Sequence, residues 1–355
     1  MVSVVSSRIL FHTPQPLDNL DSGSSVRPAK LIDAFEQIGY NVDKVIGDTK
    51  ERRQRIQEIQ QSDRDYLFCY SEPTTWPVHP LIDYRLYWYL QSKNIPTGVF
   101  YRDILWKFPE LFDHSGLKYW EAQVRYRMDL AVISRIADQI YVPSSTLGEY
   151  LNINSPIKPL PPGGTDQVAT NDSTLQLERV IYVGGLSGRY SSGLLSKACK
   201  LAANEQNVTL DLVCREPEYQ SLPNSVRQRF KSDWVTVHHK SGEALNDLYQ
   251  RADAGIIPFK PTQYNNMVMP VKLFEYLSYG LPIITTNIKE VSEFVQSNSC
   301  GVVSDSNYKD LANKIILLSN DEELYQERRE NAVLTLRQNR WIDRAEQVAS
   351  DLIPQ

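Results

Sequence analysis

Short apolar runs alternate with amphipathic stretches along most of this chain. In the first half, strand-like runs begin at residues 8, 39, 65, 97 and 139, with helix-like stretches between them. The same alternation restarts at Arg179 and continues beyond Val302. Strands that alternate with helices are typical of parallel sheets, so the pattern predicts an α/β protein with two sheets.

The best candidate for a domain boundary lies between the two halves. Residues 157–166 are dense in Pro and Gly, and the polar run 167–174 follows them. Such segments are typical of linkers. We therefore predict an N-terminal domain at 1–163, a second domain at 164–340, and a final amphipathic helix within 341–355.

Composition narrows the class of protein. With 355 residues the chain is long enough for two domains. Its net charge of -5 gives no general attraction for nucleic acid. The four cysteines are widely spaced, and no motif for a structural metal occurs. Neither a signal peptide nor a run of about 18 apolar residues is visible, which favours a reducing, cytoplasmic compartment.

The stretch Met269 to Thr286 predicts a helix that is followed at once by a strand. Pro270 suits a first helical turn, and Gly280 suits the left-handed residue past a helix end. Lys272 and Glu275 then lie on one side of the helix with Tyr276 and Tyr279, opposite the face that we expect to be buried. Because the helix would begin at the carboxyl edge of a parallel sheet, its N-terminus and Lys272 form a natural anion site. A solvated Lys272–Glu275 pair is the alternative.

The segment Pro-Val-Lys-Leu-Phe-Glu-Tyr-Leu-Ser-Tyr-Gly-Leu-Pro-Ile-Ile (270–284) resembles the nucleotide-sugar-binding signature of glycosyltransferase family 4. The resemblance implies a GT-B fold, in which two Rossmann-like domains have parallel sheets that face each other across a cleft. It implies that the last helix, within 341–355, crosses back to the N-terminal domain. It also implies that the helix N-terminus, here Met269 to Val271, meets the donor diphosphate. The glutamate that matches Glu275 would hold the ribose hydroxyls.

A glycine-rich turn follows the first strand of the second half, in Val-Gly-Gly-Leu-Ser-Gly-Arg (183–189). The spacing differs from a dinucleotide-binding fingerprint. Family 4 has a Val-Gly-Arg turn here, and this chain has Gly185 where the arginine is common. Arg189 is then expected to neutralise the diphosphate, the alternative being a surface arginine. Arg215 follows a later strand, where the family often has a glycine-rich turn near the base of the nucleotide.

The first half holds the expected acceptor side. Gly23 and Ser24 precede a predicted helix at 29–38, and the equivalent family loop lies near donor phosphates and acceptor. Arg102 and Asp103 follow a buried strand, where the family often has a His-Asp pair. Arg102 either pairs with Asp103 or contacts the acceptor or a phosphate. Asp103 is the candidate base if the reaction inverts the anomeric centre.

The predicted helix at 80–92 is aromatic on more than one face. Two interpretations stay open. One is a helix packed on both sides, and the other is a surface for a lipid-linked acceptor or a membrane interface.

One residue departs from the family pattern of two glutamates separated by seven residues. Counting back from Glu275 gives Met267, which replaces the glutamate that commonly orients the donor sugar. Asn265, Asn266 or backbone N–H groups are the candidate substitutes.

Together these features predict a nucleotide-sugar-dependent glycosyltransferase, of bacterial polysaccharide biosynthesis, with Arg189, Lys272 and Asp103 as catalytic candidates. The donor would be a UDP-sugar or GDP-sugar, and the acceptor a glycan, a lipid-linked sugar or a protein. The resemblance implies retention. No carboxylate cluster for a metal is visible in the sequence, so we expect neither a metal nor another cofactor. Expected partners exclude nucleic acid and include peripheral contact with the inner face of a membrane. A sugar-nucleotide epimerase and a catalytically silent sugar-nucleotide-binding partner are the alternatives.

Overall fold

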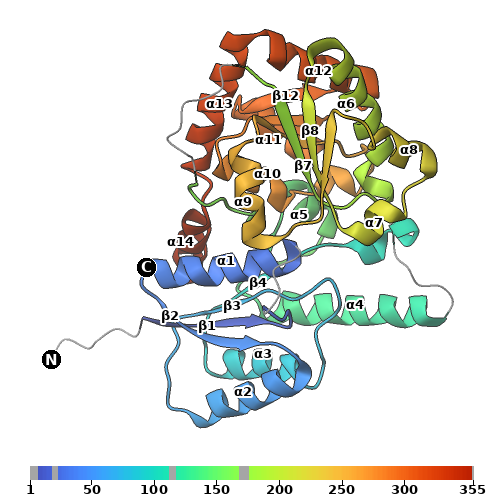
Figure 1. Ribbon diagram of the computed structural model, residues 1–355. Coiled ribbons are helices and arrows are strands. Elements are labelled where there is room, and N and C mark those ends of the chain that lie inside the picture. The colour runs from blue at the N-terminus through green and yellow to red at the C-terminus, as the bar shows by residue number, and fades with distance from the viewer. Residues whose placement is uncertain (1–6, 18–22, 112–116, 168–175, 354–355) are drawn as a thin grey trace. The chain divides into compact units, whose positions relative to one another are not determined.

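The chain forms two compact units. The computed structural model describes residues 7–17, 23–111, 117–167 and 176–353; the side chains of Gly23, Ser24, Leu117 and Arg189 lie outside that description. One unit contains Met1–Pro162 and Trp341–Gln355, and the other contains Gly163–Arg340 (Figure 1). The two are described separately below.

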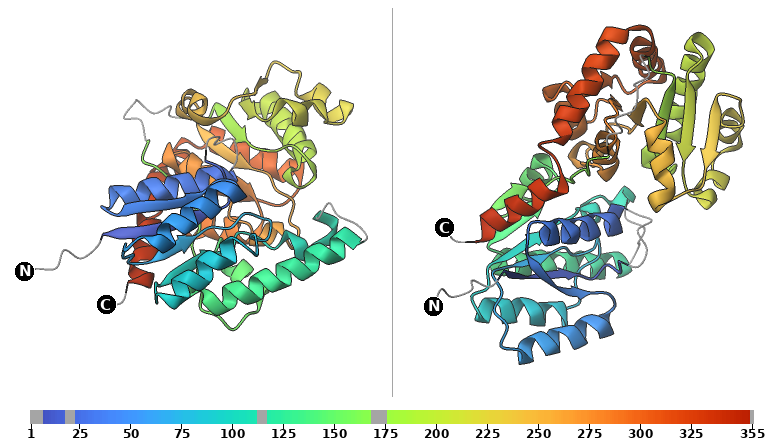
Figure 2. Two further views of the ribbon diagram at one scale, coloured as in Figure 1. Left: turned by 90° about the horizontal axis from the view of Figure 1, so that it is seen from below. Right: turned by 60° about the vertical axis from the view of Figure 1, so that its left-hand side comes forward.

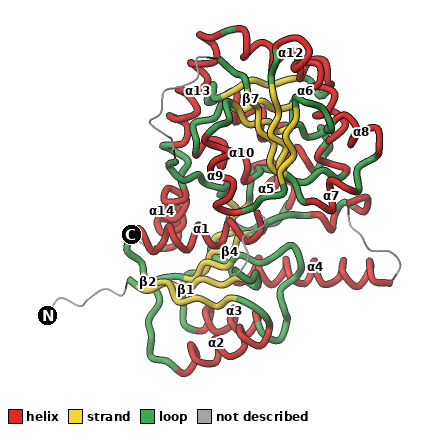
Figure 3. Tube along the Cα trace, in the orientation of Figure 1, coloured by secondary structure: helices red, strands yellow, loops and turns green. Residues whose placement is uncertain are grey.

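The first unit is a six-stranded parallel sheet with helices between the strands (Figure 3). The spatial order is β2-β1-β3-β4-β5-β6. The elements are β1 (Arg8–Thr13), α1 (Gly23–Gln37), β2 (Asn41–Ile46), α2 (Thr49–Gln61), β3 (Cys69–Ser71), α3 (Asp83–Ser92), β4 (Thr97–Phe100), η1 (Leu105–Lys107), η2 (Pro109–Leu111), α4 (Leu117–Ile136), β5 (Gln139–Val142), α5 (Ser145–Leu151), β6 (Ile157–Pro159) and α14 (Trp341–Leu352). From β1 the chain first adds β2 on one side and then β3 to β6 on the other side. The carboxyl ends of β1 and β3 therefore flank a topological switch point.

The C-terminal helix α14 belongs to the first unit by its packing. Trp341, Ala345, Val348 and Leu352 recur with helical spacing and are buried with Phe11 in one cluster. Arg344 on the same helix donates hydrogen bonds to the backbone carbonyls of Pro161 and Pro162. The last helix is therefore part of the core that surrounds the first sheet.

The second unit is also a six-stranded parallel sheet, in the order β12-β11-β10-β7-β8-β9. Its elements are β7 (Arg179–Val183), η3 (Gly188–Tyr190), α6 (Ser192–Gln206), β8 (Thr209–Val213), α7 (Glu216–Gln220), α8 (Asn224–Arg229), β9 (Val235–His238), η4 (Gly242–Leu245), α9 (Asn246–Gln250), β10 (Ala254–Ile257), η5 (Asn265–Met267), α10 (Val271–Ser278), β11 (Ile283–Thr286), α11 (Lys289–Ser297), β12 (Gly301–Ser304), α12 (Tyr308–Asn320) and α13 (Glu322–Leu336). Its switch point lies between the central strands β7 and β10.

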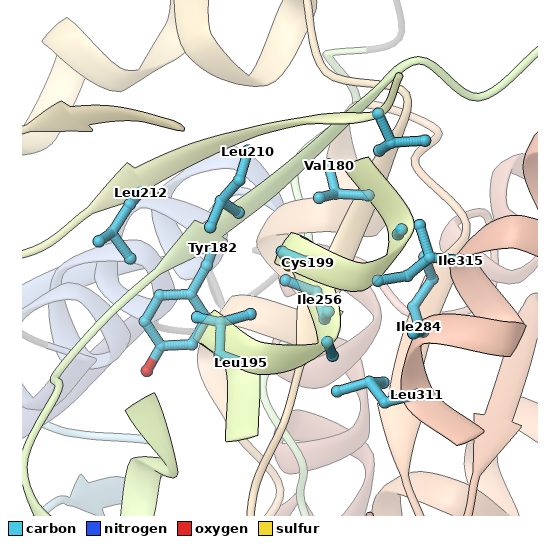
Figure 4. Packing of buried hydrophobic residues seen from close by; sticks show 14 of the residues in the cluster. Val180, Tyr182, Leu195, Cys199, Leu210, Leu212, Ile256, Ile284, Leu311 and Ile315 are labelled. Atoms are coloured by element: carbon cyan, nitrogen blue, oxygen red, sulfur yellow. The ribbon is translucent and has the colours of Figure 1, made fainter. Parts of the chain in front are cut away.

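Both faces of the second sheet are covered, because alternate strand residues point to opposite sides. Val180 and Tyr182 pack with Leu195 of α6 and Leu311 of α12 on one face (Figure 4). Ile181, which lies between them in the sequence, packs on the other face, in the cluster that contains α10. This double coverage explains why the strands read as continuous apolar runs.

A buried polar cluster ties together the elements around the switch point of the first sheet. The imidazole of His12 lies 2.8 Å from Ser71 Oγ and 3.2 Å from Asp83 Oδ1. Arg52 donates to both carboxylate oxygens of Asp83, at 2.8 and 3.0 Å. Burial alone would raise the pKa of Asp83, but the hydrogen bonds of His12 and Arg52 outweigh it and hold that pKa well below its usual range. Because these side chains are buried, the serine, histidine and aspartate serve the fold rather than an exposed site.

Helix α1 of the first unit differs from the sequence expectation. Helix α1 begins at Gly23, so Gly23 and Ser24 form its first turn instead of a loop before it. Pro28 lies inside the helix, where it removes one backbone hydrogen bond. Helix α3 buries Leu86, Tyr87 and Leu90 but leaves Trp88 exposed. Within the described ranges, no helix is both long and apolar enough to cross a lipid bilayer.

We expect Gly255→Ala to destabilise the second unit. A methyl group at this position of β10 would overlap the ring of Tyr276, which is fully buried. Overpacking of this kind costs about 1–3 kcal/mol of unfolding free energy, measurable by urea denaturation. Gly193→Ala is the matched control, because its added carbon meets only Val226, at 4.0 Å. Equal stability of the two variants would contradict the packing described for Tyr276.

We also expect the stability of the first unit to depend on the protonation of Asp129 in α4. Burial raises the pKa of Asp129 to about 7, and a hydrogen bond from Tyr84 opposes this rise. The folded state therefore keeps a proton that the unfolded chain releases near pH 4, so stability falls as pH increases from about 4 to 7.

Asp129→Asn removes this titration and keeps an oxygen for the Tyr84 hydroxyl, which donates at 3.2 Å. Between pH 4 and pH 7, the unfolding free energy of the wild type should fall by on the order of 2–4 kcal/mol relative to that of the variant. Urea denaturation at several pH values measures the difference. A difference that does not change with pH would contradict the buried, protonated carboxyl.

Candidate functional site in the second unit

The candidate site lies at the carboxyl edge of the second sheet, where β7 and β10 are neighbours. The connections from these strands lead to α6 and α10 on opposite faces of the sheet, and sheets with this arrangement commonly bind ligands at the strand ends. The glycine-rich turn follows β7, and helix α10 is the first α-helix after β10. Both features that the sequence linked to phosphate binding therefore belong to one edge.

Helix α10 is held in place by Tyr276. The sequence placed this tyrosine on the exposed side with Lys272, but the structure buries it completely. Its ring packs over Gly255, and its hydroxyl accepts a hydrogen bond from the backbone N–H of Val183, at 3.0 Å. The helix ends as expected, since Gly280 has a φ of 69°. Tyr276 thereby joins α10 directly to the residue before the glycine turn.

The turn after β7 is fixed by side chains from several elements. The hydroxyl of Tyr182 donates to the carbonyl of Gly185, and Glu218 accepts from the N–H of Leu186, at 2.7 Å. Gly184 has a φ of 149°, in the region that favours glycine. A methyl group there would overlap Lys272 Nζ, so the lysine lies directly against the turn.

Three aromatic rings surround the ammonium group of Lys272. Its Nζ lies 4.6 Å from the ring centroid of Tyr182, 5.4 Å from that of Tyr190 and 5.1 Å from that of Phe259. Such distances allow cation–π attraction. The rings orient the ammonium group without contributing a negative charge.

Glu275 lies one turn after Lys272 and is partly buried. Tyr249 of α9 donates a hydrogen bond to its Oε2, at 3.1 Å. Burial, followed by the nearby Glu275 carboxylate, raises the pKa of Tyr249 well above its usual range, so this hydroxyl remains a donor. Tyr249 also stacks on Tyr279, with ring centroids 4.9 Å apart. The carboxylate is thus oriented by an aromatic pair that sequence reasoning missed.

The other donor-side candidates lie near the same strand ends. Arg189 is in the short helix η3, but its side chain is outside the described part of the chain. Arg215 follows β8, is exposed, and lies 3.8 Å from the carboxylate of Glu218. Met269 and Pro270 are buried, and Pro270 caps α10, whose first residue is Val271.

The loop that lacks the first glutamate is well packed. Met267 is buried with 2% of its surface exposed. The side chain of Asn265 donates to the carbonyl of Lys260, at 2.9 Å, and that of Asn266 accepts from the N–H of Lys289, at 3.1 Å. Both asparagines therefore have structural partners within the loop and at the start of α11.

In the first unit, Arg102 and Asp103 each have a hydrogen-bond partner elsewhere in the chain. Arg102 donates to Glu72 Oε1 at 2.8 Å, and Glu72 is fully buried. Asp103 accepts from the hydroxyl of Thr75 at 2.8 Å and from the N–H of Leu105 at 3.1 Å. Arg27 of α1 also lies 3.3 Å from Glu72. These groups gather at the carboxyl edge of the first sheet.

Sequence reasoning also missed Glu72 and Arg27. Glu72 directly follows the short strand β3, so the rule that pointed to Arg102, a charge just past a strand end, would also have found it. Arg27 had no comparable signal, because helix α1 was expected to begin after Pro28. Its guanidinium stacks over the ring of Phe100, 3.8 Å from the centroid.

Comparison with known proteins supports the resemblance drawn from the motif. Residues 167–334 match the family glycosyl transferases group 1. TuaH of Bacillus subtilis (strain 168), assigned to teichuronic acid biosynthesis as a glycosyltransferase, is 35% identical over 85 residues. That match covers 23% of this chain and 21% of TuaH, so it spans about a fifth of the relative.

Solved structures share the fold over nearly the whole chain. Anabaena Alr3699/HepE, crystallised with UDP, has a TM-score of 0.69 at 15% identity and covers 97% of this chain and 98% of its own. WaaG, a glycosyltransferase involved in lipopolysaccharide biosynthesis, has a TM-score of 0.64 at 14% identity. The match covers 98% of this chain and 100% of the WaaG chain. This chain therefore has a GT-B fold, and its residues 167–334 match the glycosyl transferases group 1 family.

Proposed function

We propose that this protein is a glycosyltransferase that moves a sugar from a nucleoside diphosphate sugar to a glycan, lipid-linked or protein acceptor. The observation that carries the proposal is the position of Lys272, in the first turn of α10 and against the glycine turn after β7. A cation, a helix N-terminus and a glycine turn meet at a sheet switch point. This combination suits a diphosphate.

The chemistry follows from where charge develops. Cleavage of the bond to the sugar leaves negative charge on the departing diphosphate. Lys272 and the N-terminus of α10 would stabilise that charge, with Arg189 as a further cation. Because these groups supply positive charge, the proposed reaction proceeds without a metal ion. In the retaining course that the family resemblance implies, the leaving phosphate helps to deprotonate the acceptor.

UDP is the first nucleotide to test. Anabaena Alr3699/HepE was crystallised with UDP and with UDP-glucose, and a pneumococcal O-GlcNAc transferase, GtfA, with UDP and GlcNAc. In the proposed pose, the N-terminus of α10 meets the diphosphate and Glu275, one turn further on, accepts hydrogen bonds from the ribose. Gly185 and Arg215 would line the remainder of the nucleotide site. GDP is the alternative nucleotide.

The acceptor and the compartment are further parts of the proposal. Asp103, Arg102 and the start of α1 at Gly23 and Ser24 would face the acceptor, with Asp103 as the base if the reaction inverts. All four cysteines are buried free thiols, which suits the reducing cytoplasm. Peripheral contact with the inner face of a membrane would bring the enzyme to lipid-linked acceptors.

Donor turnover separates the proposed transferase from its alternatives. A transferase consumes UDP-glucose faster when acceptor is added and forms a glycoside, whereas an epimerase releases UDP and an altered sugar without an acceptor. A silent partner binds the nucleotide but consumes no donor. Chromatography of the nucleotide products, together with NMR of the sugar, distinguishes these three results.

We expect Lys272→Ala to weaken UDP binding by about tenfold or more, because a charge-assisted contact with phosphate is lost. Isothermal titration calorimetry measures the affinity. Lys309→Ala is the matched control: Lys309 is likewise the second residue of its helix, α12, and is exposed, but it follows the edge strand β12. Equal UDP affinity of wild type and Lys272→Ala would reject the site.

We expect Glu275→Gln to lose discrimination between UDP and 2′-deoxy-UDP. The wild-type carboxylate should favour UDP by about tenfold, since it accepts a charge-assisted hydrogen bond from the ribose. Glutamine keeps an oxygen for Tyr249 but not the charge. Calorimetry gives the affinity of each protein for each ligand. These four affinities give the coupling free energy between the Glu275 carboxylate and the ribose 2′-hydroxyl. Unchanged discrimination in the variant would place the ribose elsewhere.

A further inference from the structure

Helix α4 of the first unit carries apolar side chains on its outward face. Trp120, Val124 and Met128 have exposed fractions of 65%, 54% and 55%. They recur every four residues, so they form one stripe along the helix. Single exposed apolar residues are common on protein surfaces. Here, however, three of them lie in line on one helix.

The opposite face of α4 explains why this stripe is left outside. Ala122, Tyr126, Asp129 and Ile133 are buried, and they lie about half a turn away from the stripe. Tyr126 stacks on Trp106, with ring centroids 5.5 Å apart, and Tyr84 of α3 donates to Asp129. The helix is therefore already anchored to the unit by its inner face, beside α3 (Figure 2). The outer stripe contributes nothing to that anchoring.

The exposed charges of α4 are mostly basic. Four basic residues, Lys118, Arg125, Arg127 and Arg135, are exposed along the helix, against one exposed acid, Glu121. Asp129, the other acid of the helix, is buried, and its raised pKa of about 7 reduces its negative charge at neutral pH. This local positive charge contrasts with the net charge of -5 of the whole chain.

We propose that the outward face of α4 binds a membrane surface that contains anionic phospholipids. Trp120 would sit at the headgroup level, where tryptophan is favoured, and Val124 and Met128 would reach the boundary of the acyl chains. The four basic side chains would contact lipid phosphates, each adding about 1 kcal/mol near such a surface. The helix lies on the membrane and does not cross it.

Charge also favours a membrane over a second copy of this chain. A symmetric dimer through this face would bring the basic flanks of two α4 helices together, and like charges would repel. One line of three apolar side chains is also narrow beside the 1,200–2,000 Å² or so that stable protein interfaces bury in total. Lipids, in contrast, can adapt to a narrow stripe and supply the complementary charge.

Flotation with lipid vesicles tests the proposal on the full chain. Wild type should bind vesicles of phosphatidylcholine that contain phosphatidylglycerol, and should bind pure phosphatidylcholine at least about tenfold more weakly. Binding should fall as the salt concentration rises, because exposed charges are screened. Absence of binding to the anionic vesicles would overturn the proposal.

Two variants assign the binding to this face. Val124→Glu should weaken vesicle binding by about tenfold, because it adds a negative charge and removes apolar area. Leu334→Glu is the matched control, since Leu334 is 54% exposed on a helix of the second unit, α13. Equal losses in both variants, or none in Val124→Glu, would reject α4 as the surface.

Two accompanying measurements distinguish membrane binding from self-association and from damage to the nucleotide site. Analytical ultracentrifugation should give the same oligomeric state for wild type and Val124→Glu; a wild-type dimer that the substitution dissociates would assign the face to self-association instead. UDP affinity should be equal in the two proteins. The vesicle assay needs no nucleotide, so its failure is distinguishable from failure of the proposed transferase function.

Discussion

The packing of Tyr276 against Gly255 is the constraint on which the candidate site depends. Its ring occupies the space that a side chain on the central strand β10 would fill. Its hydroxyl then reaches the backbone N–H of Val183, the last residue of β7. One buried side chain therefore fixes the distance between α10 and the glycine turn. The position of Lys272 against Gly184 follows from that spacing.

Glu72 and Asp83 of the first unit and Lys272 of the second unit have different surroundings. At the edge of the first sheet, Glu72 is flanked by Arg27 and Arg102, and Asp83 is bound by Arg52, so these buried charges have opposite partners. In the second unit, Lys272 is surrounded by rings, which attract a cation through their quadrupoles but carry no net charge. In the proposed function, the ammonium group held among these rings would contact the donor diphosphate.

The departure at position 267 also has a structural interpretation. Met267 is buried in the loop before α10, and the neighbouring asparagines bond to Lys260 and to the start of α11. The loop is therefore stabilised by packing and by its own amides. Methionine supplies no carboxylate at this position, so contacts to a donor sugar there would come from other groups, such as the backbone. In the proposed function, the contacts to the donor sugar would therefore differ from those of relatives that keep both glutamates.

The sequence by itself determined the features that depend on local periodicity and turn chemistry. Alternating apolar and amphipathic segments predicted two parallel sheets, and both are present in a GT-B fold. Gly280 and Pro270 predicted the ends of α10 to within one residue, because φ preferences act locally. The motif placed Lys272 and Glu275 on one side of a helix at the edge of a sheet. The roles of the site residues stay predictions.

Contacts between segments far apart in the sequence were decided only by the tertiary structure. Tyr276 was expected to be exposed, since helical spacing alone could not reveal the space over Gly255. Tyr249, Glu72 and the rings around Lys272 come from separate elements, and no local pattern brings them together. The outward stripe of α4 is equally invisible in the sequence, because apolar residues occur on both faces of that helix and only packing shows which face is covered. Local physics sets the elements, whereas the choice of which faces meet depends on the whole fold.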